Sequence, residues 1–164
     1  MITIIDYGVG NINAFVNVYK RLNVPTKIAK TAQDLESAEK LILPGVGHFD
    51  HAMGELVNSG MLDTLNELVL EKMLPIIGIC VGMQMMANSS DEGTSEGLKW
   101  IDATVKKFDE TKIRQVTRLP HMGWNDAYPV VTNPLFEGLE KDALFYFLHS
   151  YYFDCKNAED VIAV

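Results

Sequence analysis

The sequence contains few basic residues and no long apolar segment. Lys and Arg together number 14 against 22 Asp and Glu, and the formal net charge is −8. Because a phosphate backbone is bound by clusters of Lys and Arg, this balance argues against a nucleic-acid partner. No apolar run approaches the roughly 20 residues of a bilayer-spanning helix, so we expect no membrane partner either.

Cysteine is also scarce. Cys80 and Cys155 are the only two, and they lie far apart in the sequence. Residues 1–5 lack the basic flank and small-residue cleavage site of a signal peptide and are typical of a first strand. We therefore expect a cytoplasmic, reduced protein without a disulfide framework. The His and Cys residues lack metal-ligand spacing, and no motif indicates a cofactor.

Short apolar runs rich in β-branched residues alternate with amphipathic stretches along residues 1–88. Strands are predicted at 2–6, 26–30, 40–45 and 75–79, and helices at 13–22, at 51–70 with a break near Ser59-Gly60, and from Met83 to Asn88. This alternation predicts an α/β fold with a mostly parallel sheet and helices on both faces. Three later segments, 100–108, 119–130 and 144–154, are predicted to be extended and to add antiparallel strands to the sheet. Residues 1–164 are long enough for a single domain.

Three glycine-containing loops follow predicted strands. They are DYGVGN at residues 6–11, PGVGHF at 44–49 and CVGMQ at 80–84. Open parallel sheets bind ligands at the carboxyl ends of their strands, so these loops are expected to meet at the ligand site. The first loop could be a dinucleotide fingerprint, but it lacks the third glycine of that motif.

The stretch GICVG at residues 78–82 has the spacing of a nucleophile elbow, a sharp turn between a strand and a helix. Cys80 would project from the top of the sheet, and the amide of Val81 would face the oxyanion of a tetrahedral intermediate. The spacing therefore suits acyl transfer through a cysteine thioester. The alternative is a buried structural cysteine, which is common after an apolar strand.

Five motifs in register carry a family resemblance: LPGVGHFDHAM, GICVGMQMM, SSDEG, LPHMGWN and FYFLHSYYF. Together they resemble the class I, triad-type glutamine amidotransferases, in particular the glutaminase subunits of imidazole glycerol phosphate synthase in histidine biosynthesis. A paralogous group that supplies ammonia for amidino sugars of surface polysaccharides is similar as well. The resemblance implies hydrolysis of L-glutamine to glutamate and ammonia, no cofactor, and delivery of ammonia to a (β/α)8-barrel cyclase in a heterodimer.

The resemblance also assigns roles to residues. Cys80 matches the nucleophile and Val81 one oxyanion donor, while Val46 and Gly47 belong to the oxyanion loop, where a peptide flip can supply a second N–H. The matched glutamine-binding residues are Gln84, Glu92 and the backbone groups of Ser150 and Tyr151. Without the family, Gln84 and Glu92 would be ordinary surface positions, and residues 145–153 an aromatic core strand.

The family docks its partner near the glutamine site, so we expect Asn11, Trp124 and Asn125 at the interface. A tryptophan buried in a loop core is the alternative for Trp124.

The family's catalytic base is the His of a His-Pro-Glu motif, which these 164 residues do not contain. The available histidines are His48, His51, His121 and His149. Each occupies another place in a family motif, so we expect none of them to be the base and expect the domain to lack its C-terminal end. A non-catalytic regulatory subunit with the same fold and a cysteine amidase of another kind stay open as alternatives.

Overall fold

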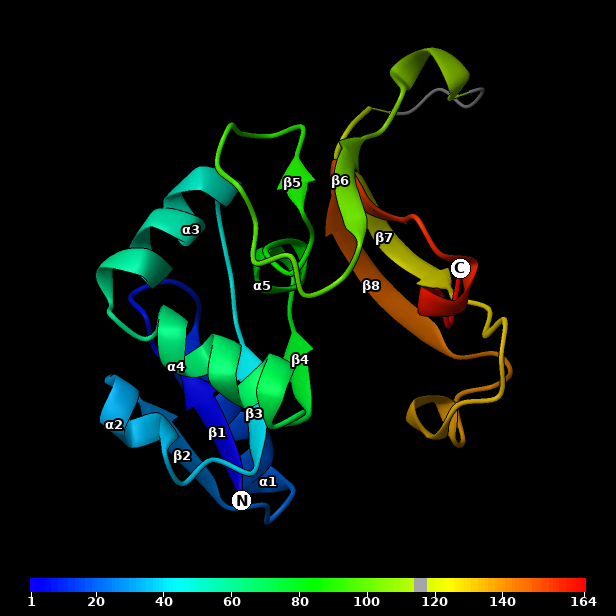
Figure 1. Cartoon of the computed structure of the whole chain (residues 1–164). Helices are drawn as coiled ribbons and strands as arrows, with labels where there is room; N and C mark the ends of the chain where they lie inside the picture. The colour runs from blue at the N-terminus through cyan, green and yellow to red at the C-terminus, as the bar shows by residue number, and fades with distance from the viewer. Residues whose placement is uncertain (114–117) are drawn as a thin grey trace.

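The computed structural model describes residues 1–113 and 118–164, shown in Figure 1. Four parallel strands form the main sheet in the order β2-β1-β3-β4: β1 (Ile2–Ile5), β2 (Thr26–Ala29), β3 (Lys40–Leu43) and β4 (Ile76–Gly78). The connecting helices are α1 (Ile12–Arg21), α2 (Ala32–Leu35), α3 (Phe49–Asn58) and α4 (Leu62–Asn66), with a π-helical turn, η1 (Glu67–Glu71). In Figure 1 α4 lies in front of the sheet and α1 behind it, so helices cover both faces as predicted.

Local sequence explains the strands and the break between α3 and α4. The apolar runs in β1 and β3 supply fully buried side chains such as Ile5 and Leu43, as expected for a parallel sheet covered on both faces. The predicted break falls at Gly60, whose φ of 71° is left-handed. Glycine adopts that conformation at the end of a helix without a Cβ penalty, so the chain turns there and restarts as α4.

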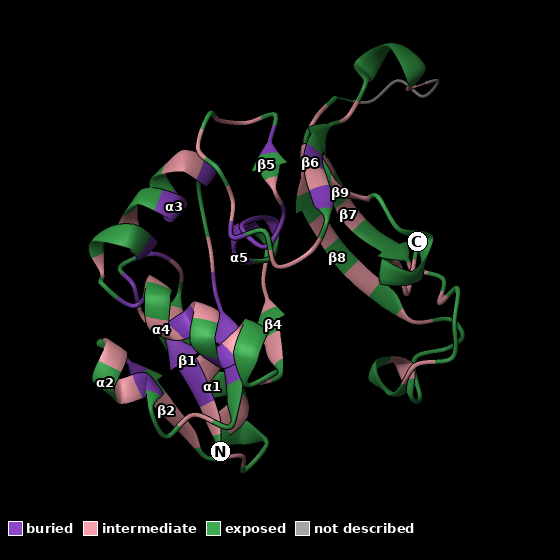
Figure 2. Cartoon of the chain, viewed as in Figure 1, coloured by how far each residue is buried: buried purple, intermediate pink, exposed green. Residues whose placement is uncertain are grey.

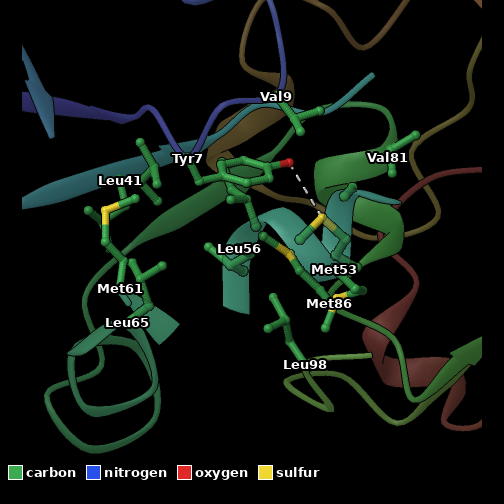
Figure 3. Close-up of a cluster of buried hydrophobic side chains, with 14 of the residues drawn as sticks. Tyr7, Val9, Leu41, Met53, Leu56, Met61, Leu65, Val81, Met86 and Leu98 are labelled. Carbon is green, nitrogen blue, oxygen red and sulfur yellow. Dashed lines mark hydrogen bonds between the residues drawn. The ribbon is translucent and has the colours of Figure 1, made fainter. Parts of the chain in front are cut away.

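The hydrophobic core lies between the main sheet and α3, α4 and α5 (Val81–Gln84). Figure 2 shows the buried residues concentrated in these elements, whereas β7 and β8 are exposed or half-buried. In Figure 3, Met61, just before α4, and Leu65 of α4 lie near Leu41 of β3. Val81 of α5 and Leu56 of α3 belong to the same buried cluster. Burial of Val81 therefore fixes the position of α5 against the sheet.

Helix α5 begins at Val81 and ends at Gln84, so the predicted start at Met83 and end at Asn88 were wrong. The prediction followed the apolar run MQMM, but a run of apolar residues does not determine where a tight turn releases the chain into a helix. The turn at Cys80 places Val81 at the first helical position, with its side chain buried.

The C-terminal strands form two further sheets. One is β5-β6-β9 and the other is β7-β8, built from β5 (Ser89–Ser90), β6 (Ala103–Lys107), β7 (His121–Asp126), β8 (Leu144–His149) and β9 (Tyr151–Cys155). Three 3-10 turns, η2 (Glu110–Lys112), η3 (Pro134–Phe136) and η4 (Ala158–Asp160), lie between or after them. The β6-β9 and β7-β8 pairs are antiparallel, as predicted. The expectation that these strands extend the main sheet was wrong.

The strands β8 and β9 are consecutive, and the chain changes partner between them at Ser150. His149 at the end of β8 pairs with His121 of β7, whereas Tyr151 at the start of β9 pairs with Lys107 of β6. Neither strand contains a fully buried residue, so the interpretation of this segment as an aromatic core strand was wrong. Among the described helices, none is long and apolar enough to cross a membrane.

Candidate active site

Cys80 lies in a strained turn between β4 and α5. Its φ is 56° and its ψ is −122°, a combination that residues with a side chain rarely adopt. Cys80 is exposed, so the alternative of a buried structural cysteine was wrong. The backbone thus has the strand-turn-helix form of a nucleophile elbow, as the GICVG spacing predicted.

Two glycines of the GICVG stretch are required by close backbone approaches. A Cβ on Gly78 would lie 2.5 Å from the Cα of Met83, and a Cβ on Gly82 would lie 2.0 Å from the carbonyl oxygen of Leu43. Both obstructing atoms belong to the backbone, so a side chain at either position would push the elements apart. The glycines therefore allow α5 to pack directly against the carboxyl ends of β3 and β4.

The predicted oxyanion loop packs against the first turn of α5. A Cβ on Gly45 would lie 2.2 Å from the amide nitrogen of the second α5 residue. Val46 is exposed, and Gly47 has a left-handed φ of 88°. In the described part of the chain the amide of Val81 donates no backbone hydrogen bond. The amide next to Cys80 is therefore available to an oxyanion, and the individual roles of Val46, Gly47 and Val81 stay predictions.

Tyr7 anchors the oxyanion loop and was not singled out in the sequence. Its hydroxyl donates a hydrogen bond of 2.8 Å to the carbonyl oxygen of Pro44 and lies 3.5 Å from the sulfur of Met85. Burial raises the pKa of Tyr7 well above its ordinary value, so the hydroxyl keeps the proton that it donates. Figure 3 shows the ring in the core beside Val9. The only sign of this role in the sequence was the position of Tyr7, a polar aromatic residue directly after the first predicted strand.

Gln84 is the last residue of α5, and Glu92 lies two residues after the end of β5. Gln84 is only 7 % exposed, so the interpretation as a plain surface residue was wrong for this position. Glu92 is half-buried, and its Oε2 accepts a hydrogen bond of 2.9 Å from the amide of Phe49 at the start of α3. That bond places the carboxylate at the positive end of a ten-residue helix.

A second carboxylate fastens the same loop to α3. Asp50 accepts hydrogen bonds from the amides of Thr94 at 3.0 Å and Ser95 at 2.9 Å. These two backbone donors lower the pKa of Asp50 below its ordinary value. Asp50 thereby holds the segment after Glu92 in place. Its partners are more than 40 residues away in sequence, so no local pattern could have revealed this role.

Ser150 and Tyr151 lie at the end of the β5-β6-β9 sheet where the chain leaves β5 toward Glu92. Tyr151 pairs with Lys107, and the amide of Lys107 donates a hydrogen bond of 3.0 Å to the carboxylate of Asp91. Asp91 directly precedes Glu92, so the predicted pocket residues of β9 and of the β5 end are brought to one edge. Their roles in binding glutamine stay predictions.

The three predicted interface residues are in two different places. The Asn11 side chain caps α1 by accepting a hydrogen bond of 3.2 Å from the amide of Ala14. Trp124 and Asn125 lie on β7, and the Trp124 side chain is 66 % exposed. The alternative of a tryptophan buried in a loop core was therefore wrong. Figure 1 shows α1 and β7 in separate parts of the molecule.

None of the four histidines is hydrogen-bonded to Cys80 among the described residues. His48 caps α3 with a 3.2 Å hydrogen bond from the amide two residues later, and His51 is exposed on α3. His121 and His149 lie 3.1 Å apart, Nδ1 to Nε2. Residues 1–113 and 118–164 contain no cluster of three or more His, Cys, Asp or Glu placed to hold a metal ion.

A family model described as "Glutamine amidotransferase class-I" matches residues 3–164. The chain belongs to the class-I glutamine amidotransferase family. Fold similarity agrees with this assignment, because a solved structure titled "Crystal structure of glutamine amidotransferase" superposes with a TM-score of 0.72 over 99% of the chain and 78% of its own, at 20% identity.

Curated relatives of this class-I glutamine amidotransferase share much higher identity. Imidazole glycerol phosphate synthase subunit HisH of Bdellovibrio bacteriovorus is 55% identical over 99% of the chain and 80% of its own length. The HisH subunit of Leptospira borgpetersenii is 49% identical over 100% of the chain and 80% of its own length. HisH 2 of Pseudomonas aeruginosa is 44% identical over 99% of the chain and 79% of its own length.

Proposed function

We propose that this class-I glutamine amidotransferase is the glutaminase subunit of an imidazole glycerol phosphate synthase, acting in histidine biosynthesis. The observation that carries the proposal is the strained turn at Cys80, packed against the loop of residues 44–47 at the carboxyl edge of the sheet. Relatives from three organisms with 44% to 55% identity bear that enzyme's name. No observation favours the surface-sugar pathway, and an exposed cysteine in an intact elbow supports an enzyme over a regulatory subunit.

Hydrolysis begins with attack by the sulfur of Cys80 on the side-chain carbonyl carbon of glutamine. The carbonyl oxygen becomes an oxyanion, which accepts hydrogen bonds from the amide of Val81 and from a backbone amide of the Val46-Gly47 segment. The carbon–nitrogen bond then breaks, the leaving NH2 group takes up the proton that the thiol has lost and departs as ammonia, and a thioester remains on the cysteine. Water attacks the thioester and releases glutamate and the free thiol.

Glutamine is held at its amino-acid end by Gln84, Glu92 and the backbone of Ser150 and Tyr151. The α-ammonium group of the substrate requires a carboxylate, and Glu92 supplies one. Its Oε2 accepts a hydrogen bond from the amide of Phe49, and we propose that its other oxygen, Oε1, binds the ammonium group. This arrangement lets one carboxylate cap α3 and bind a charged ligand at the same time.

Ammonia passes to a (β/α)8-barrel cyclase subunit, since free ammonia at neutral pH is mostly protonated and no longer nucleophilic. The β7-β8 sheet supplies the docking face in the cytoplasmic complex. Paired residues Met122 and Leu148, and Trp124 and Tyr146, present side chains that are 54–66 % exposed. Exposed aromatic residues that cluster on one face are typical anchors of protein interfaces. Asn125 follows Trp124 on β7, but its side chain lies on the opposite face, where it is bonded to His121. Asn125 is proposed to contact the partner from that side of the pair, and Asn11 from the start of α1.

The test uses the full-length protein in complex with the cyclase subunit and compares two nitrogen sources. Cys80→Ala should abolish synthesis from glutamine and leave synthesis from added ammonium salt unchanged. Cys155→Ala is the matched control and should retain both activities. Glutamine-dependent synthesis by the Cys80→Ala complex would overturn the proposed nucleophile, and failure of the wild-type protein to support any cyclase would overturn the proposed pathway.

A further inference from the structure

We propose that His121 and His149 are positioning residues for the glutamine pocket, and this inference rests on the proposed function. They lie at the point where the chain passes from β8 to β9. Their imidazole rings connect Asn125 on the exposed β7 strand with the backbone carbonyl of Tyr151. The pair thereby holds the Ser150-Tyr151 backbone, which the glutamine pocket uses.

The contacts form one continuous chain of hydrogen bonds. Nδ1 of His149 lies 2.7 Å from the carbonyl oxygen of Tyr151, and its Nε2 lies 3.1 Å from Nδ1 of His121. Nε2 of His121 is in turn bonded to Nδ2 of Asn125. Each ring nitrogen of both histidines therefore has one partner, so the orientation of both rings is determined at both ends.

The carbonyl oxygen at one end fixes the direction of every bond in the chain. A carbonyl only accepts, so Nδ1 of His149 must carry the proton. In a neutral ring Nε2 then accepts, and Nδ1 of His121 must donate to it. Nε2 of His121 is left as an acceptor, which matches the Nδ2 donor that Asn125 presents to it. Both histidines are thus assigned the Nδ1–H tautomer.

Aromatic rings surround the pair and restrict its movement. Phe108 meets the ring of His149 edge-on at a centroid distance of 5.1 Å, and Phe147 stacks on His121 at 5.2 Å. The amide of Phe108 also donates a hydrogen bond of 3.1 Å to the carbonyl oxygen of Ser150. One cluster therefore holds the carbonyl groups of both pocket residues. The amide of Phe108, directly after β6, binds the carbonyl of Ser150, and the imidazole of His149 binds the carbonyl of Tyr151.

The hydrogen-bond chain begins on the face of the β7-β8 pair opposite Met122 and Trp124, because successive side chains of a strand alternate between faces. Asn125 is exposed on that opposite face with His121, and it lines an open groove together with His121 and Phe108. Rotation of its amide by a bound partner would present an oxygen in place of the donor that His121 now accepts from. The histidine pair would then have to rearrange, so contact at Asn125 is coupled to the position of the Tyr151 carbonyl.

The first test reads the tautomers directly by 15N NMR of imidazole-labelled protein at mildly alkaline pH, and it requires no activity. We expect His121 and His149 to be protonated at Nδ1, the less common tautomer of free neutral imidazole. His51, exposed on α3, serves as an internal reference. Protonation of His149 at Nε2 would overturn the assignment, whatever the protein's catalytic function.

The second test compares substitutions at His149 in the complex with the cyclase subunit. His149→Phe keeps a ring but removes the donor to Tyr151, and it should raise the KM for glutamine roughly five- to tenfold, the effect of one lost hydrogen bond, with little change in kcat. His149→Asn places an amide N–H near the position of Nδ1 and should restore most of the affinity. His51→Phe is the control and should leave KM unchanged.

The outcomes separate this inference from the proposed function. An active wild-type complex with unchanged KM in His149→Phe would refute the positioning role alone. An inactive wild-type complex would refute the proposed function, and the NMR result would still decide the hydrogen-bond chain. A folded state common to all variants is verified by circular dichroism, and ammonium-dependent synthesis should be equal in all of them.

Discussion

The strain at Cys80 leads to a prediction about stability that is independent of activity. A non-glycine residue at φ 56° and ψ −122° costs about 1–3 kcal/mol, and glycine is free of this cost because it lacks a Cβ. Glycine also raises the entropy of the unfolded chain, which costs about 0.4–1 kcal/mol. Cys80→Gly should therefore be more stable than Cys80→Ala by about 1 kcal/mol, since both variants lack the sulfur.

The assay is thermal unfolding of the two variants at one protein concentration. For a chain of this length, 1 kcal/mol corresponds to a rise in Tm of about 2–4 °C. Cys155 offers a matched control because it lies in β9, paired with Ala103. There, Gly should be less stable than Ala by about 0.5–1 kcal/mol, since glycine weakens a strand. A Cys80→Gly variant no more stable than Cys80→Ala would refute the strained-turn reasoning.

Three further predictions concern charges and the docking face. Glu92→Gln keeps an acceptor oxygen for the α3 amide but removes the charge, so glutamine affinity should fall by about 1.5–3 kcal/mol, roughly ten- to a hundredfold, with a much smaller loss of stability, about 0.3–1 kcal/mol, from the lost charge at the helix N-terminus; wild-type KM would remove Glu92 from the pocket. Trp124→Ala should weaken binding of the cyclase subunit at least fivefold, or by about 1 kcal/mol, in calorimetric titration, while Leu135→Ala, equally exposed on η3, should not; equal affinities would exclude the β7-β8 face. The lowered pKa of Asp50 means that its contribution is complete above the pKa of the unfolded chain, about 3.9, and is lost as pH falls through the lower folded value. Between pH 5 and 3 the Tm of the wild type should therefore fall further than that of Asp50→Asn, and parallel curves would contradict this.

The parallel sheet could be predicted from the sequence because its strands are buried on both faces. Continuous apolar runs predicted strands at residues 2–6 and 40–45, which extend one and two residues beyond the observed β1 and β3. The helix break at Gly60 was also predictable from a local signal, since glycine adopts the left-handed conformation without a Cβ penalty. Both features depend on residues that are close together in the sequence, so a single sequence is enough to predict them.

The C-terminal sheets were predicted as extended segments but not as separate sheets. Pairing of Lys107 with Tyr151, or of His121 with His149, joins positions 44 or 28 residues apart. A strand pattern gives the face on which a side chain lies, whereas the partner strand depends on the path of the whole chain. The histidine pair was invisible in the sequence for this reason.

In the candidate site too, features set by neighbouring residues were predicted and features set by distant residues were missed. Cys80 and its glycines were found because the elbow is a short motif with a steric cause. Tyr7 and Asp50 were missed because their partners, Pro44 in one case and Thr94 and Ser95 in the other, are distant in sequence. Glu92 was expected to bind substrate, but its bond to α3 could be seen only in the structure.

The central claim is that Cys80 is the nucleophile of a glutaminase, and covalent labelling tests it most directly. The protein is treated with a glutamine-mimicking electrophile, with and without excess glutamine, and the modified peptides are identified by mass spectrometry. Cys80 is exposed, whereas burial and the nearby carboxylates raise the pKa of Cys155, so a general preference for Cys80 is expected even from a simple alkylating reagent. Glutamine-specific recognition therefore has to be shown by protection. The account predicts that the analogue labels Cys80 alone, that glutamine prevents this, and that glutamine does not slow labelling by iodoacetamide at Cys155. Modification of Cys155 in preference to Cys80, or labelling of Cys80 that glutamine leaves unchanged, would contradict it.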